Sequence, residues 1–184
     1  MARVLVLYGT SEGQTATVAE RIGDVLEAAG HDPTVTHVLY RPETLRLADY
    51  DAIIIGASVH GGKHQRYVTR YVKKQVDELN RLPSAFFSVS LTAAEDTDEA
   101  RDRARREVAA FLAETGWNPD ETAVVPGALK YRQYGTLKRF VMKQVAKRTS
   151  VDSDTSREYE YTDWKDVESF TTDFVGSFEK SSAR

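Results

Sequence analysis

Short runs of consecutive apolar residues alternate along the chain with longer stretches in which apolar residues recur every three or four positions. The apolar runs predict strands at residues 3–8, 32–37, 52–56, 84–91 and 122–129. The periodic stretches predict helices at residues 14–29, 65–79 and 97–115, and a last helix that starts at 162 or 163. Strict alternation of strand and helix is typical of an α/β protein in which helices cover both faces of a parallel sheet.

Five strands with helices in this order fit a doubly wound, flavodoxin-like sheet with the strand order 2-1-3-4-5. In such a sheet the binding crevice lies at the carboxyl ends of the strands, where the direction of winding reverses. Three loops border that crevice in this sequence. They follow the first, third and fourth predicted strands, at residues 8–15, 56–64 and 88–96.

The loop after the first strand reads YGTSEGQT and leads directly into the first helix. Its hydroxyl groups, together with the free N–H groups at the start of a helix, form a concavity that favours a phosphate group. We assign the phosphate to Thr10, Ser11, Glu12, Gly13, Gln14 and Thr15. The alternative is an ordinary capped first helix with no ligand.

The kind of phosphate site can be narrowed by what the loop lacks. It has no Gly-Lys-Ser/Thr of a nucleoside-triphosphate loop and no Gly-x-Gly-x-x-Gly of a dinucleotide fold. It has no Lys or Arg either, so the loop is neutral except for Glu12. Because a carboxylate repels phosphate, we expect the Glu12 side chain to point outward while its N–H stays available.

The other two loops offer groups for a flat ligand. Two adjacent glycines in residues 56–64 let the backbone come close to a ring, Ser58 offers a hydroxyl, and His60 can stack on a ring or donate to it. His64 is either a second such residue or a solvated loop histidine. The loop that begins at Ser88 contributes small and polar residues: Ser88, Val89, Ser90, Leu91 and Thr92.

Composition limits the chemistry. The 184 residues fit one domain, 1–184, and the absence of cysteine excludes disulfides, thiolate metal sites, cysteine nucleophiles and iron–sulfur clusters. No signal peptide and no spanning apolar run is evident, and we expect a cytoplasmic protein without a metal.

An unusually long connection, at about residues 130–157, separates the last strand from the last helix. Residues 130–148 hold seven basic residues and no acidic one, whereas the rest of the chain holds 18 basic and 28 acidic residues. A predicted amphipathic helix at 136–148 could lie on an anionic membrane surface, bind a polyanionic substrate or partner, or cover the domain's own core. We expect no nucleic acid as a partner.

Several stretches resemble the menaquinone-dependent protoporphyrinogen oxidase family, a flavodoxin-like branch with a long insert. They are residues 10–15 (TSEGQT), 50–51 (YD), 55–58 (IGAS), 71–74 (YVKK), 82–89 (LPSAFFSV), 127–131 (GALKY) and 161–164 (YTDW). The resemblance implies bound flavin mononucleotide (FMN) and oxidation of protoporphyrinogen IX to protoporphyrin IX. It also implies transfer of electrons to a membrane quinone such as menaquinone, in heme biosynthesis.

The resemblance also suggests roles for the loop residues. The flavin ring and ribityl chain would lie against Ser58, Val59, His60, Ser88, Val89, Ser90, Leu91 and Thr92. Lys130, Tyr131 and Arg132 are candidates for gripping a porphyrinogen carboxylate, because arginine offers a bidentate fork. His60 is the candidate proton acceptor. The helix at 136–148 would dock the domain on the cytoplasmic face of the membrane, near the quinone pool.

Two rival functions stay open at this point. One is an electron-carrier flavodoxin that shuttles between protein partners, although such a carrier would usually present an acidic face around the flavin. The other is a quinone reductase supplied by a nicotinamide, for which the sequence has no nucleotide fingerprint. A receiver-type signalling domain is disfavoured, because no paired carboxylates follow the first strand.

Overall fold

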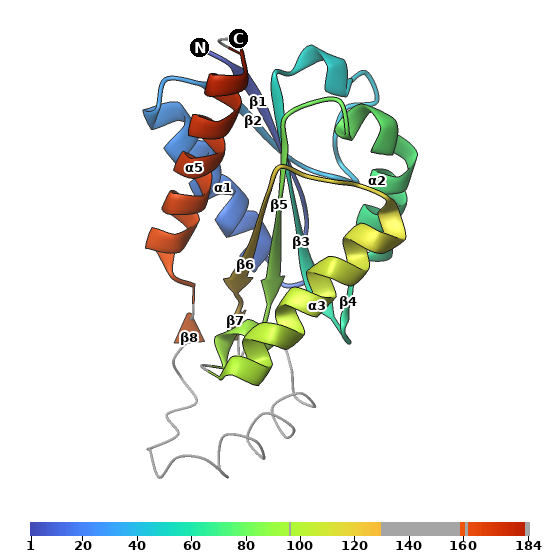
Figure 1. The fold of residues 1–184 in the computed structure, drawn as a ribbon, viewed down its shortest axis with the longest axis vertical. Coiled ribbons are helices and arrows are strands. Elements are labelled where there is room, and N and C mark those ends of the chain that lie inside the picture. The colour runs from blue at the N-terminus through green and yellow to red at the C-terminus, as the bar shows by residue number, and fades with distance from the viewer. Residues whose placement is uncertain (96, 130–158, 161, 183–184) are drawn as a thin grey trace.

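The computed structural model describes residues 1–95, 97–129, 159–160 and 162–182. A parallel sheet lies at its centre (Figure 1). Its strands are β1 (Arg3–Gly9), β2 (Asp32–His37), β3 (Ala52–His60), β5 (Ser84–Ser90) and β6 (Glu121–Pro126). They lie in the order β2-β1-β3-β5-β6. The predicted order 2-1-3-4-5 is confirmed, because the additional strand β4 (Lys63–His64) pairs only with the end of β3.

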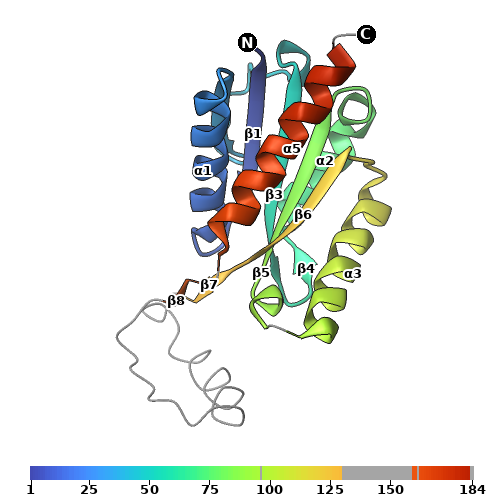
Figure 2. The ribbon, with the colours of Figure 1, turned by 60° about the vertical axis from the view of Figure 1, so that its left-hand side comes forward.

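Helices cover both faces of this sheet (Figures 1 and 2). One face carries α1 (Gln14–Ala28) and α5 (Trp164–Ser182), and the other carries α2 (Arg66–Leu79) and α3 (Asp98–Thr115). Short 3₁₀ turns at Leu47–Asp49 and Thr92–Ala94 complete the connections. The arrangement is the doubly wound architecture that the alternating pattern predicts.

The sheet separates two hydrophobic cores, and β1 contributes to both because successive side chains of a strand point to opposite faces. Val4 and Val6 pack on the side of α1 and α5, whereas Leu5 and Leu7 pack on the side of α2 and α3. All four are fully buried, and burial of each such side chain stabilises the fold by about 1.5–3 kcal/mol. The strand ends that carry the predicted loops are therefore held on a rigid frame.

The segment after the third strand differs from its prediction as a loop. β3 continues to His60, and β4 returns along it in an antiparallel hairpin with the pairs Val59–His64 and His60–Lys63. Gly61 and Gly62 make the turn with φ angles of 60° and 78°. A two-residue hairpin turn that needs two positive φ angles favours glycine at both positions, which explains the pair.

Two boundaries also differ from the expected ones. α1 ends at Ala28, and Gly30 follows with a φ of 84°. The predicted strand at 122–129 breaks after Pro126, and its last part, β7 (Ala128–Leu129), pairs instead with β8 (Tyr159–Glu160).

The described residues on either side of the predicted insert therefore lie side by side, because Leu129 pairs with Tyr159. The insert itself, with Lys130, Tyr131, Arg132 and the predicted helix at 136–148, lies outside the described residues. None of the helices in the described part of the chain is long and apolar enough to cross a bilayer.

Candidate functional site

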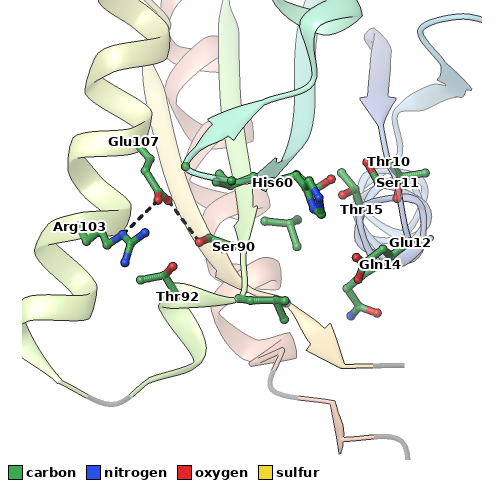
Figure 3. A pocket seen from close by; sticks show the side chains of 17 residues that line it. Thr10, Ser11, Glu12, Gln14, Thr15, His60, Ser90, Thr92, Arg103 and Glu107 are labelled. Carbon is green, nitrogen blue, oxygen red and sulfur yellow. Dashed lines mark hydrogen bonds and ion pairs between the residues drawn. The ribbon is translucent and has the colours of Figure 1, made fainter. Parts of the chain in front are cut away.

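A cavity of about 400 Å³ opens at the carboxyl ends of β1, β3 and β5 (Figure 3). Most of the residues that the sequence assigns to a cofactor line it: Thr10, Ser11, Glu12, Gln14, Thr15, Ser58, Val59, His60, Val89, Ser90, Leu91 and Thr92. Gly61, Gly62, Arg103, Glu107 and Gly127 complete the lining. The structure thus brings the three predicted loops to one cavity.

In the described part of the chain, no side chain forms a capping hydrogen bond at the start of α1, which follows the loop after β1. Gly13 is the N-cap residue with a φ of 92°, and its N–H donates to Thr10 Oγ1 at 2.8 Å. The first turn of α1 holds no acidic residue. The N-terminal N–H groups and the helix dipole therefore remain available to an anion.

Thr15 supplies the most specific sign of a ligand in this loop. Its side chain is fully buried, and Oγ1 has no hydrogen-bond partner within the described part of the chain. A buried hydroxyl without a partner costs about 1–3 kcal/mol. A phosphate oxygen at the start of α1 would accept the hydrogen bond and remove that cost, so the loop fits the phosphate of a nucleotide-type cofactor.

Gln65, which precedes α2, connects the phosphate loop to the end of β3. The Ser58 N–H donates to Gln65 Oε1 at 3.0 Å, and Gln65 Nε2 donates to the hydroxyls of Ser58 and Ser11, the latter at 3.3 Å. The Ser58 and Ser11 hydroxyls, both assigned to the cofactor from the sequence, therefore share one amide. Nothing in the local sequence around Gln65 signals this role.

A chain of hydrogen bonds supports the loop from the side of β2. The Leu39 N–H donates to His37 Nδ1 at 3.1 Å, so the proton of the neutral ring is on Nε2, which lies 3.2 Å from the Tyr67 hydroxyl. Tyr67 in turn donates to the Thr10 carbonyl at 3.4 Å. Burial lowers the pKa of His37 and raises the pKa of Tyr67, and both shifts favour the neutral forms that this hydrogen-bonded arrangement requires.

The two histidines of the β3–β4 hairpin have opposite surroundings. His60 is exposed and lines the cavity, as Figure 3 shows. His64 is buried against Phe86 and Phe111, and its Nε2 lies 2.8 Å from Ser88 Oγ. Burial lowers the pKa of His64 to about 4. The alternative of a solvated His64 is therefore wrong, because the hairpin turns this ring inward.

Ser88 and Gly13 are the two predicted cofactor residues that do not line the cavity. Ser88 is buried on β5 and its hydroxyl is engaged by His64, which places it behind the cavity wall. Gly13 acts through the backbone conformation that shapes the loop. Gln14 does line the cavity, and its Nε2 donates to Thr162 Oγ1 at 2.7 Å, which ties the loop to the start of α5.

The opposite wall comes from α3. The sequence predicts this helix but not its contribution to the cavity. Glu107 has a side-chain exposure of only 8%, accepts a hydrogen bond from Ser90 Oγ at 3.3 Å, and lies 3.6 Å from Arg103 Nε. Figure 3 shows this pair across the cavity from Thr10 and Thr15. A sequence signal existed, because Glu107 lies in the same helical stripe as the buried Ala104, Val108 and Phe111.

The described residues contain no cluster of His, Cys, Asp or Glu that could hold a metal ion. The donor set around the cavity is instead one of hydroxyls and amides at the phosphate loop, where Glu12 is the one charged residue, with a charged pair on α3. This set fits an organic phosphate cofactor.

Comparison with known proteins identifies the class that this fold and loop define. The flavodoxin domain family matches residues 5–156. Among solved structures, oxidised flavodoxin 1 from Bacillus cereus superposes with a TM-score of 0.56 at 16% identity, covering 95% of this chain and 97% of the flavodoxin. The protein therefore has a flavodoxin-type domain, a class whose cofactor is FMN.

Closer relatives specify the branch. Protoporphyrinogen IX dehydrogenase [quinone] from Escherichia coli K12 is 35% identical over 176 residues, which is 94% of each chain. The protein of the same name from Leishmania major is 33% identical over 173 residues, covering 94% of this chain and 74% of that one. The chain belongs to the family of these quinone-dependent dehydrogenases.

Proposed function

We propose that this protein is an FMN-dependent oxidoreductase that oxidises protoporphyrinogen IX to protoporphyrin IX and passes the electrons to a quinone, in heme biosynthesis. The observation that carries the proposal is a flavodoxin-type cavity whose phosphate loop contains a buried Thr15 hydroxyl without a hydrogen-bond partner among the described residues. Two relatives that align with 94% of this chain, each named protoporphyrinogen IX dehydrogenase [quinone], support this choice of substrate and acceptor.

FMN would place its phosphate at the loop of Thr10, Ser11, Glu12, Gly13, Gln14 and Thr15. Its ring and ribityl chain would lie toward Ser58, Val59, His60 and the segment from Ser88 to Thr92, with the Ser88 side chain behind the wall. When bound, FMN would supply the acceptor for three successive two-electron oxidations of the macrocycle and, after each, the donor to the quinone.

The cavity lining supports an enzyme over a carrier with a shielded flavin. Among the described residues that line it, His60 is the only one with an aromatic ring, so no Tyr or Trp covers a flat ligand there. A substrate can then approach one face of the ring. We assign to His60 the acceptance of a proton from a pyrrole N–H, because an imidazole accepts protons near neutral pH and His60 is exposed at this face.

The insert would supply the remaining contacts. Lys130, Tyr131 and Arg132 would bind a substrate carboxylate, and the basic helix at 136–148 would bring the domain to a membrane quinone such as menaquinone on the cytoplasmic face. A variant that lacks residues 130–150 should keep FMN and lose turnover with membrane quinone. Unchanged turnover in that variant would contradict the docking role.

An anaerobic assay with protoporphyrinogen IX and a menaquinone analogue tests the proposed activity. We expect porphyrin fluorescence to rise with time, in proportion to the holoprotein added, and to stay at the non-enzymatic rate with the FMN-free protein. A holoprotein that does not exceed the FMN-free control would contradict the proposal and favour a carrier flavodoxin.

A further inference from the structure

A second cavity, of about 640 Å³, lies between α2 and α3 beside the FMN cavity. We call it the α2–α3 groove. Gly62 and Glu107 line both cavities, so the groove begins where the FMN cavity ends, at the turn of the β3–β4 hairpin. Open space surrounds Gly61 and Gly62, because a Cβ at either position would meet no atom within 4 Å.

The groove has a row of cations along α2. Arg66, Arg70 and Lys73 lie at helical spacing on one face, and Lys63 of β4 precedes them. All four are exposed. They are not balanced by the opposite wall, whose acidic residues are Glu107 and Glu114 of α3.

Both of these carboxylates already have partners. Glu107 is held by Ser90 and Arg103, two residues that line the FMN cavity. Glu114 accepts from Lys73 at 2.9 Å, and this contact, with a smaller contribution from Lys63, keeps the pKa of Glu114 below its ordinary value. Arg66 and Arg70, at the end of the groove nearest the hairpin, form no ion pair with any described residue.

This charge arrangement opposes the stability of α2. Arg66 is the first residue of the helix, where the macrodipole disfavours a cation, and no acidic residue lies in the first turn. Arg66 and Arg70 are also like charges at positions i and i+4, which destabilise a helix by a few tenths of a kcal/mol. A cationic pair that weakens its own helix is explained if an anion binds beside it.

We propose that Arg66 and Arg70 of the α2–α3 groove bind one propionate carboxylate of the porphyrinogen, while its macrocycle reaches over the Gly61–Gly62 turn to the FMN cavity. This inference rests on the proposed function for the identity of the substrate. The arginine forks match carboxylate geometry, and their exposure lets the product leave again.

The test is a fluorescence titration of FMN-loaded protein with the product protoporphyrin IX and with its dimethyl ester, in the same detergent. The double variant Arg66→Gln/Arg70→Gln should bind the dicarboxylate about tenfold more weakly, because the exposed ion pairs of both arginines with the carboxylate are lost. Its affinity for the ester should equal that of the wild type. The matched control is Lys74→Gln/Arg81→Gln, which removes the same charge from exposed positions outside the groove.

Two further readouts separate a binding role from a structural one. The double variant should keep the FMN content of the wild type and should unfold in urea at an equal or higher midpoint, because the repulsion in α2 is removed. Equal weakening for dicarboxylate and ester, or an effect no larger than the control's, would overturn the proposal. The proposal would also be overturned if Lys130→Gln/Arg132→Gln abolished the difference in affinity between dicarboxylate and ester while the groove variant kept that difference.

These titrations stay informative if the proposed activity fails. Turnover by the wild type tests the function, whereas the difference between dicarboxylate and ester tests the groove alone. If the wild type turns over normally and the Arg66→Gln/Arg70→Gln variant binds the dicarboxylate as tightly as the wild type does, only the inference about Arg66 and Arg70 is refuted.

Discussion

The phosphate loop and the α2–α3 groove would both receive negative charge, but they are built in opposite ways. The loop has no cation, and its most specific group is the fully buried hydroxyl of Thr15. The groove has four exposed cations and no buried donor assigned to a ligand. A buried neutral site selects a ligand by geometry, whereas an exposed cationic site acts through a field that salt screens.

The contrast matches the residence time that each ligand needs. A resident cofactor benefits from buried hydrogen bonds that water cannot replace, and a substrate that must leave after reaction benefits from solvated contacts. The two sites meet at Gly62 and Glu107, so a ligand in the groove can contact a ligand in the cavity. Each prediction below changes one side of this comparison.

The largest effect is expected from a charge placed inside the neutral loop. Thr15→Glu puts a carboxylate at the start of α1, where it would occupy and repel the phosphate position. We expect the purified variant to contain no FMN, measured by visible absorption. The control Thr17→Glu adds the same charge at an exposed position two residues later and should retain the cofactor. Equal FMN content in both variants would place the phosphate elsewhere.

Removing only the Thr15 hydroxyl should give a smaller effect with two signs. Thr15→Val keeps the volume, so we expect FMN affinity to fall about 10- to 100-fold, which corresponds to one hydrogen bond to a charged group. The FMN-free variant should be as stable as the wild type or up to about 1 kcal/mol more stable, because a buried unpartnered hydroxyl is gone. FMN titration and urea unfolding of the FMN-free protein measure the two quantities. A large loss of stability with unchanged affinity would make Thr15 structural.

The buried floor of the groove gives a pH-dependent prediction. His64 has a folded-state pKa of about 4, below the ordinary 6.5, because burial disfavours its charged form. The unfolded chain binds the extra proton between these values, so this contribution to stability is complete above pH 6.5 and is lost as the pH falls toward 4. At pH 5 the loss relative to pH 7 should be about 2 kcal/mol.

Urea unfolding of wild type and His64→Leu at the two pH values measures this contribution as a difference. The wild type should lose about 2 kcal/mol more than the variant between pH 7 and pH 5. The control His60→Gln removes an exposed histidine of the same hairpin, so comparing the two variants isolates the effect of the buried ring. An identical pH dependence in wild type and His64→Leu would contradict the inward placement of that ring.

Salt should have the smallest effect and should separate the two sites most simply. Raising the ionic strength shortens the screening length to about 8 Å at 0.15 M, which weakens exposed charge pairs far more than buried hydrogen bonds. We expect FMN affinity to change by less than about threefold between low and physiological salt, and protoporphyrin IX affinity by about tenfold. Isothermal titrations at both salt concentrations check this. Parallel salt dependence for the two ligands would remove the contrast between loop and groove.

The sequence predicted the parts of the molecule that depend on local, contiguous patterns. The strand order follows from regular alternation of apolar runs and periodic stretches, and the phosphate loop follows from hydroxyls and glycines next to one helix start. Each of these signals consists of residues that are close to one another in sequence, so reading it requires no knowledge of contacts between distant elements.

The remaining features depend on contacts between distant elements. His64 is buried because Phe86 of β5 and Phe111 of α3 pack against it, and neither is near it in sequence. The Gly61–Gly62 pair lines the cavity, as a close approach to a ligand requires, but the sequence did not predict that the pair also makes a hairpin turn. Glu107 lay unnoticed in an apolar stripe, where an acidic residue is itself a signal of a buried polar contact.

The central claim is that the FMN held by the neutral loop is the direct oxidant of a porphyrinogen. Anaerobic addition of protoporphyrinogen IX to the FMN-loaded protein tests it, with the visible flavin absorption as the readout. The account predicts that the absorption bleaches when the porphyrinogen gives up its first two electrons. It also predicts that the absorption returns, and that porphyrin forms over three such steps, when an excess of a menaquinone analogue is added. A flavin that dithionite bleaches but protoporphyrinogen IX leaves unchanged would contradict it.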